Sequence, residues 1–490
     1  MSSERAARTG PAGIVDDISP KPVSITPTAA GRTHDAAIKY RRALEGPIVT
    51  ATLRLAAPPI IASLAQMLIP LTQAYFISKL GTDALAGLSL VFPCLLLMSM
   101  ASLGVAGGVG SVVARNLGAG RTAEAEALIV NAIALAMLFG AAFSAIEALF
   151  GPTLLQFLGG SGRSLAAGLA YADIIFGASV LIWLGTLLGS ALVGAGNTMV
   201  PSLLIMLGVI IVVPLSPILM FGWGPAPRLG IAGAGWAVAV SSIVSLAVLM
   251  LYFHSKRSPL RLSLDVRLVE RRFLSEILRL GGVSAIAAII PSLTLALVTA
   301  AVGRFGSDAI AGYGAASRVD FVLLPLYNGI GTGVLTMVGT NVGAKLFVRA
   351  RQAAWLGALV AAGVGCATGL VFASAPLIWL GCFTEDPTAI AVGSLYLHTV
   401  GLQYAFVGLG VVLTAASIGA GRAFLPLLAN IIRMSIAAGC GWIVMVGFGA
   451  GVEAVFVAVA LSGVAFCGTF VTAEMLGHLI PRREPPTPRF

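Results

Sequence analysis

Charged residues are scarce in this chain. They make up 10% of its 490 residues, against about 25% in ordinary soluble domains. A soluble protein with 58% apolar residues and a mean hydropathy of +0.97 could not cover its surface with polar atoms. Lipid is therefore the expected solvent for most of the chain.

Residues that carry enzyme chemistry are also scarce. The four histidines lie far apart, the five cysteines form no Cys-x-x-Cys pair, and no P-loop sequence is present. A membrane-embedded enzyme would need a cluster of such residues, and ATP-driven transport by this chain alone would need a P-loop. We expect no enzyme activity, no metal site and no cofactor. The net charge of +10 does not indicate nucleic acid, because the basic residues lie in short loops.

Long apolar runs dominate the rest of the sequence. Twelve of them reach the roughly 20 residues that a helix needs to cross a bilayer. In lipid the backbone must satisfy its own hydrogen bonds, so each run is predicted to be a helix. The approximate spans are 56–78, 86–110, 127–150, 168–192, 200–222, 231–253, 280–302, 310–335, 353–375, 393–415, 425–447 and 452–475.

The basic residues predict an orientation. With a cytoplasmic N-terminus, the inner loops hold thirteen Lys and Arg residues and the outer loops four, as the positive-inside rule requires. We expect both termini in the cytoplasm and a location in a bacterial-type inner membrane. Residues 1–46 and 479–490 are expected to be cytoplasmic tails, the first of them disordered. The basic connector 255–276 is expected to be a tether and an interfacial helix.

The sequence repeats itself at a separation of 225 residues. Asn116 and Asn341 begin the same Asn-x-Gly-Ala loop, and GTDALAG at 81–87 returns as GSDAIAG at 306–312. A repeat over most of a half indicates duplication. We expect an N-lobe (47–254) and a C-lobe (277–478) of six helices each, related by a pseudo-two-fold axis along the membrane normal, with substrate bound between them. The repeated loop residues are Asn116, Gly118, Asn341, Gly343, Gly194, Gly196, Gly419 and Gly421. The glycines at 118 and 343 are expected to take left-handed turn conformations.

Five stretches resemble the multidrug and toxic compound extrusion (MATE) family: LGTDALAGLSLVFP, SVVARNLGAGR, LVGAGNTMVPS, GYGAASRVD and GTNVGAK. The likeness covers roughly residues 50–475. The resemblance implies a cation-driven antiporter that exports large amphipathic compounds, often cations, through a cavity between two lobes.

The carboxylates that drive coupling in many relatives are missing here. The resemblance places one in helix 1, where this chain has Gln73, and an Asn and Asp in helix 5, where it has Val212 and Ser216. Helix 7 also lacks an acid. The usual coupling residues therefore cannot be carried over, because a glutamine does not titrate.

Other polar groups in the spans are candidates for substrate binding or coupling, since such groups are costly in a membrane. Arg318 and Asp320 lie in helix 8, two residues apart, so each needs a partner from another helix; Asp320 is the best single candidate for a titratable site. The alternative is a structural pair. Arg433 is expected to extend toward the cytoplasm.

Five further candidates lie in the other spans. Gln66 and Gln73 share one face of a continuous helix 1 and are expected to face the cavity or to bond another helix. Asp173 and His398 are 225 residues apart and could form a pH-sensitive pair at the outer mouth, or be solvated there. Glu147 lies near the same boundary.

We therefore expect an all-α secondary antiporter that exports amphipathic, cationic organic compounds in exchange for H⁺ or Na⁺ by alternating access. A flippase for lipid-linked saccharides, an exporter of a neutral or anionic metabolite, and a major-facilitator transporter remain alternatives. The expected partners are a small-molecule substrate and membrane lipids, with a monomer as the default oligomeric state.

Overall fold

The computed structural model describes residues 47–262 and 265–480, and every regular element in this part of the chain is a helix. Ten helical segments are long and apolar enough to cross a membrane, and two bent helix pairs raise the total to twelve. The prediction of an all-α membrane protein with twelve spans is confirmed for the described residues. The first and last tails, apart from 479–480, lie outside them.

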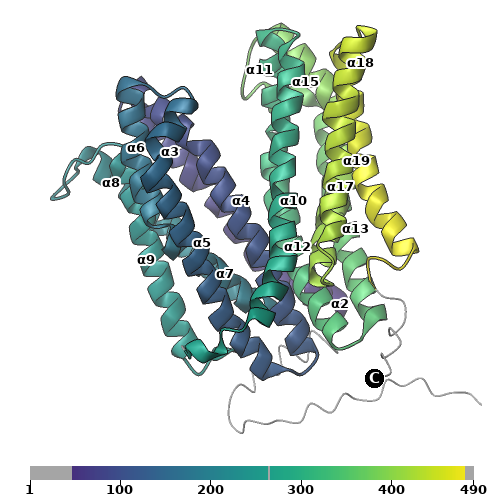
Figure 1. Cartoon of the computed structure of the whole chain (residues 1–490). Helices are drawn as coiled ribbons and strands as arrows, with labels where there is room; N and C mark the ends of the chain where they lie inside the picture. The colour runs from purple at the N-terminus through teal and green to yellow at the C-terminus, as the bar shows by residue number, and fades with distance from the viewer. Residues whose placement is uncertain (1–46, 263–264, 481–490) are drawn as a thin grey trace, which may run out of the picture. The chain divides into compact units, whose positions relative to one another are not determined.

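The first six spans form the N-lobe, coloured purple to blue-green in Figure 1. Its helices are α2 (Ile48–Gln66), α3 (Leu68–Ser78), α4 (Thr82–Gly118), α5 (Thr122–Phe157), α6 (Gly162–Gly177), α7 (Ser179–Gly194), α8 (Met199–Phe221) and α9 (Ala232–His254).

The last six spans form the C-lobe. Its helices are α10 (Arg271–Gly303), α11 (Ser307–Ser317), α12 (Val319–Gly343), α13 (Phe347–Ser374), α14 (Pro376–Leu380), α15 (Pro387–Val400), α16 (Gln403–Gly419), α17 (Phe424–Met434), the π-helix η2 (Ser435–Cys440), α18 (Gly441–Phe448) and α19 (Val452–Met475).

The fourth and tenth spans are bent, whereas the sequence predicted two unbroken helices. α6 meets α7 at 46°, and α15 meets α16 at 58°. Polar groups of the bent segments are satisfied by other helices: the Ser179 hydroxyl donates to the Gly140 carbonyl at 2.6 Å, and the Tyr404 carbonyl accepts from Tyr327 at 2.9 Å. Neither break contains a proline, so the commonest sequence signal for a kink is missing.

The two lobes meet along a seam, which we define as the contacts of α4 with α10 and of α12 with α2. A Cβ atom added to Gly104 would lie 2.2 Å from Ala285 Cα, and one added to Gly329 would lie 2.3 Å from the Ile60 side chain. Gly104 and Gly329 are 225 residues apart, and so are Ile60 and Ala285. Each contact is therefore the image of the other, as the predicted pseudo-two-fold axis requires.

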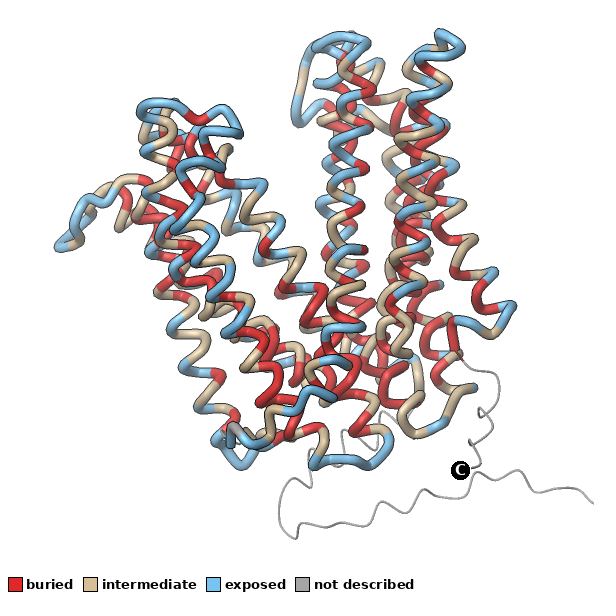
Figure 2. The backbone as a smooth tube through the Cα atoms, viewed as in Figure 1, coloured by how far each residue is buried: buried red, intermediate tan, exposed pale blue. Residues whose placement is uncertain are grey.

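The first helix of each lobe begins against the opposite lobe. Ala56 of α2 lies in the hydrophobic core of the C-lobe, whereas Phe273 and Ile277 of α10 lie in a core of the N-lobe. Figure 2 shows buried residues gathered where α4, α10 and α12 approach one another, toward the end of the molecule that carries the connector. We call this the connector end. The seam is therefore packed at one end of the membrane domain.

The described part of the connector docks on α5. The Asn131 amide donates to the Leu268 carbonyl at 2.9 Å and accepts from the Glu270 N–H at 3.1 Å. The only regular element of connector residues 255–262 and 265–270 is a short 3₁₀ turn, Val266–Leu268. The expected interfacial helix is thus absent from these residues.

Candidate functional site

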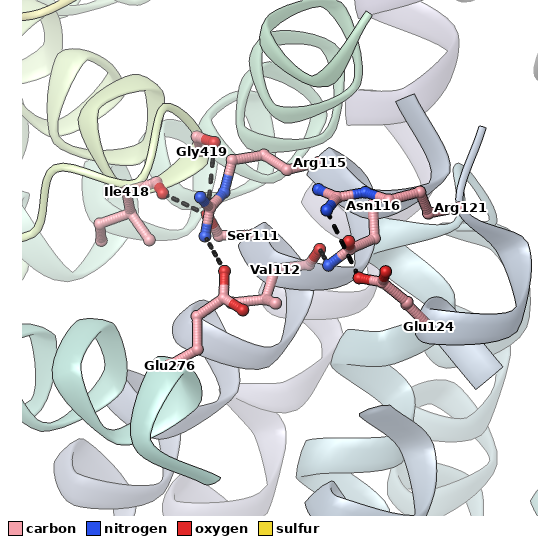
Figure 3. Close-up of polar contacts among 9 residues, drawn as sticks. All are labelled: Ser111, Val112, Arg115, Asn116, Arg121, Glu124, Glu276, Ile418 and Gly419. Atoms are coloured by element: carbon pink, nitrogen blue, oxygen red, sulfur yellow. Dashed lines mark hydrogen bonds and ion pairs between the residues drawn. The ribbon is translucent and has the colours of Figure 1, made fainter. Parts of the chain in front are cut away.

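Two reciprocal hydrogen bonds join the lobes at the connector end of the seam. The Ser111 hydroxyl of α4 donates to the Ile418 carbonyl of α16, and the Thr336 hydroxyl of α12 donates to the Val193 carbonyl of α7, at 2.9 Å. Ser111 and Thr336 are 225 residues apart, as are Val193 and Ile418. The first of these bonds is drawn in Figure 3. Equivalent residues of the two repeats therefore form the hydrogen bonds that join the lobes here.

One charged contact breaks this symmetry. Arg115 Nη2 lies 3.2 Å from Glu276 Oε1, and the pair is partly exposed. The residue 225 positions after Arg115 is Thr340, which has no charge. The ion pair joins α4 of the N-lobe to α10 of the C-lobe, so it adds a contact on one side of the axis only (Figure 3).

The repeated Asn-x-Gly-Ala loops allow the lobes to cross closely. A Cβ atom on Gly118 would lie 2.1 Å from the Thr340 carbonyl oxygen, and one on Gly343 would lie 2.1 Å from that of Arg115. The prediction that these two glycines adopt left-handed conformations is wrong, because both end a right-handed helix. The left-handed residues are Gly120, with φ 75°, and Lys345, with φ 62°.

The other repeated loop residues have structural roles. The Asn116 and Asn341 amides donate to the carbonyls four residues earlier, at 3.0 and 2.7 Å. Gly194 packs against the backbone of α4, and Gly419 packs against the backbone of α12. The turns that follow need positive φ at Gly196 (78°) and Gly421 (81°).

Gln73 has a buried position in the N-lobe. Its amide donates to the Ala234 carbonyl at 3.3 Å, and its oxygen accepts from the Tyr171 hydroxyl at 3.2 Å. Gln66 is exposed. The two do not share an environment, although α2 and α3 form one span with only Met67 between them. For Gln73 the structure thus contains the interhelical hydrogen bond that the sequence left as an alternative.

Asp320 faces a polar cluster inside the C-lobe. It is half-buried in the first turn of α12, and it has no hydrogen bond or direct ion pair within the described chain. The nearest positive charge that acts on it is Arg433 of α17.

Several tyrosines of the C-lobe lie near this carboxylate. Four of them lie within electrostatic range of Asp320 and come from α11, α12, α15 and α16. Arg433 also lies over the Phe466 ring, 5.4 Å from its centroid. The four tyrosines are Tyr313, Tyr327, Tyr396 and Tyr404.

Arg318 does not belong to this cluster. It lies at the break between α11 and α12, is exposed, and stacks on Phe383 at 4.9 Å from the ring centroid. Sequence reasoning placed Arg433 near the membrane surface and missed it as the partner of Asp320. The one available signal was Arg433 itself, a charged residue inside an apolar run.

Asp173 and His398 are both exposed, on α6 and α15. No ion pair joins them within the described residues. The acidic neighbour of Asp173 is Glu147 of α5, close enough for the two carboxyl groups to share a proton. The structure therefore places Asp173 beside Glu147 and not beside His398, its counterpart in the repeat.

Solved structures with the same fold are known. The chain superimposes with a TM-score of 0.82 on a MOP superfamily transporter from Pyrococcus furiosus, at 21% identity over 91% of this chain and 98% of the other. An outward-facing multidrug resistance MATE family transporter gives a TM-score of 0.83 at 21% identity, with the same coverage. At such identities the likeness concerns the fold alone.

Curated relatives cover most of the chain as well. A protein of Shewanella oneidensis named FAD transporter is 28% identical over 80% of this chain and 86% of its own length. A probable multidrug resistance protein, NorM, of Caulobacter vibrioides is 24% identical over 86% of this chain and 91% of its own. The MatE family model matches residues 58–218 and 284–443, once in each lobe. This chain belongs to the MATE family of membrane transporters.

Proposed function

We propose that this protein is a secondary antiporter, with the connector end and both termini in the cytoplasm. It exports amphipathic organic compounds in exchange for H⁺ or Na⁺, and Asp320 is the coupling group. The observation that carries the proposal is the half-buried Asp320 carboxylate, which no protein hydrogen bond occupies and which faces Arg433 across the C-lobe. Gln73 and Ser216 stand where the family resemblance places coupling acids, and Val212 stands where it places an Asn, so none of the three can titrate,.

Coupling requires a group that alternates between two states of charge. When Asp320 is ionised it attracts Arg433 and so draws α12 toward α17. When it binds H⁺ or Na⁺ this attraction is lost. Because α12 also carries the Thr336 hydrogen bond to the N-lobe, the charge state of Asp320 can bias the position of the helix that closes the connector end.

Efflux from proteoliposomes with imposed H⁺ or Na⁺ gradients tests this proposal, with ethidium as the cationic probe. We expect gradient-driven efflux by the wild type and its loss in Asp320→Asn. Asp308→Asn is the matched control, because Asp308 is exposed at the start of α11. Unchanged efflux in Asp320→Asn, with normal elution from a sizing column, would remove Asp320 from the mechanism.

A second candidate cargo is an anionic flavin dinucleotide. The specific observation in its favour is the Shewanella relative named FAD transporter, which matches 80% of this chain. The net charge of +10 and the few acids in the spans agree with an anionic cargo. Self-exchange, measured separately for FAD and for ethidium in the same proteoliposomes, distinguishes the two, since only a transported compound exchanges with its own pool.

A further inference from the structure

A pocket opens between three helices of the N-lobe, away from the seam. It encloses about 490 Å³ of empty space, its open mouth included. Its walls come from α4, α5 and α6, and all but one of the lining residues lack an ionisable carboxyl or basic group. The lining residues include Cys94, Phe143, Glu147, Gly151, Ala172 and Phe176.

Glu147 is the one acid in this apolar wall. Its Oε1 atom is fully enclosed and has no hydrogen-bond partner. A Cβ atom on Gly151 would lie 2.6 Å from this oxygen, so a methyl group at that position would displace the carboxylate. An acid held against apolar walls is costly unless a partner compensates it.

No basic group of the three helices is free to be that partner. They contain two arginines in all: Arg115 pairs with Glu276, and Arg163 pairs with Asp83 at 3.1 Å. The other titratable groups near Glu147 are the Cys94 thiol from α4 and the Asp173 carboxyl from α6. Both are neutral or negative, so the site lacks a positive charge.

The mouth of the pocket is apolar. Leu97, Ile146 and Leu154 line it and are 49%, 51% and 39% exposed. They lie on helices that span the membrane, so hydrocarbon chains are the solvent expected at this opening. A ligand that fits both the acidic interior of the pocket and its apolar mouth has a positive head and an apolar tail.

We propose that this pocket binds the ammonium head of an amphipathic amine, with its tail extending through the mouth into the bilayer. The head lies against Glu147, with Asp173 beside it, and Phe143 and Phe176 supply aromatic walls that also favour a cation. This site deepens the proposed function, because it gives the cationic cargo a lateral binding position outside the seam.

Cys94 provides a direct probe, since its thiol lies in the pocket wall beside Glu147. In a variant that keeps Cys94 and has serine at the other four cysteines, we compare modification by aminoethyl methanethiosulfonate, which is cationic, with modification by neutral methyl methanethiosulfonate. The protein is held in phosphatidylglycerol nanodiscs and read by mass spectrometry. We expect the cationic reagent to be favoured about tenfold, as for other negatively charged clefts.

Two variants test the role of the carboxylate. Glu147→Gln should bring the ratio of the two rates to about one, and Gly151→Ala should lower it as well, because it displaces the carboxylate without removing the charge. Glu124→Gln is the control, at the opposite end of the same helix. A ratio that is the same in the wild type and in Glu147→Gln would overturn the proposal.

Competition identifies the ligand class. Dodecyltrimethylammonium should protect Cys94 and dodecanol should not; equal protection by both would show that only the tail binds and would overturn the proposal. If phosphatidylethanolamine nanodiscs already protect Cys94, the bound ammonium is a lipid headgroup; if only the added amine protects, it is a free amphiphile. If gradient-driven efflux is observed but the labelling pattern is not, the pocket proposal is wrong and the antiport proposal stands. If the labelling pattern is observed but gradient-driven efflux is not, the antiport proposal is wrong and the pocket proposal stands.

Discussion

Ser111 of α4 donates a hydrogen bond to the Ile418 carbonyl of α16, across the boundary between the lobes. Thr336, its counterpart in the repeat, makes the equivalent bond to Val193. In the alternating access that we propose, these bonds break whenever the connector end opens. They therefore set part of the free-energy difference between the two states of the transporter.

Removing these hydroxyls should favour opening at the connector end. Each net hydrogen bond contributes about 1 kcal/mol, so Ser111→Ala and Thr336→Val should each raise the open population about fivefold. Spin labels at the exposed positions Ala123 and Val348, in a background without native cysteines, report the distance between the lobes. Thr186→Val is the control, since this hydroxyl bonds only within α7; the same distance distribution in all variants would contradict the prediction.

The seam glycines should tolerate no added methyl group. Gly104→Ala places a Cβ atom against the Ala285 backbone, and overpacking of this kind costs about 1–3 kcal/mol,. Gly329→Ala should cost somewhat less, because the nearest backbone atom there, Ile60 N, lies 2.8 Å from the added Cβ atom, whereas Ala285 Cα lies 2.2 Å from that of Gly104. Thermal unfolding in detergent measures both. Gly185→Ala, with open space around it, should leave the midpoint unchanged or raise it; a loss as large as that of Gly104→Ala would refute the packing argument.

The sequence predicted the arrangement of the helices better than the roles of individual loop residues. The apolar runs and the 225-residue repeat predicted twelve helices in two lobes, because lipid leaves a spanning segment few backbone options. The repeat also identified the positions that cross at the connector end. Their roles were harder to predict: Gly118 and Gly343 are needed for close approach and not for a turn, and only the packing of two helices shows that difference.

The candidate site was predicted less completely. Asp320 was identified as a charge in a costly place, but its partner Arg433 is 113 residues away, and no local pattern links two helices at that distance. Gln66 and Gln73 were assigned to one face because a seven-residue spacing implies it in a continuous helix. The interruption at Met67 lies just before Pro70, which has no N–H to donate to the Gln66 carbonyl,.

Gln73 should be more important for stability than Gln66. Gln73→Leu leaves the Tyr171 hydroxyl without a partner and removes the Gln73 bond to the Ala234 carbonyl, which keeps its bond within α9, and an unsatisfied buried group costs about 1–3 kcal/mol. Gln66→Leu, at an exposed position, should change the unfolding free energy by no more than about 0.5 kcal/mol. Equal unfolding midpoints for the two variants would mean that the Gln73 bonds add nothing to stability.

Asn131 should protect the connector from proteolysis. Asn131→Ala removes two hydrogen bonds that hold Leu268 and Glu270 against α5. We expect trypsin to cut the basic connector several times faster in this variant, since cleavage requires local release of the chain. Asn328→Ala, an exposed change on α12, serves as the comparison. Identical cleavage rates would mean that other contacts hold the connector.

The paired contacts of Gly104 with Ala285 and of Ile60 with Gly329 have the form of an isologous dimer interface, in which one patch of surface meets its own copy. A single polypeptide thus retains the geometry of two subunits. Its halves, produced as separate polypeptides and brought together in one bilayer, already carry every residue that this self-complementary surface needs for reassembly.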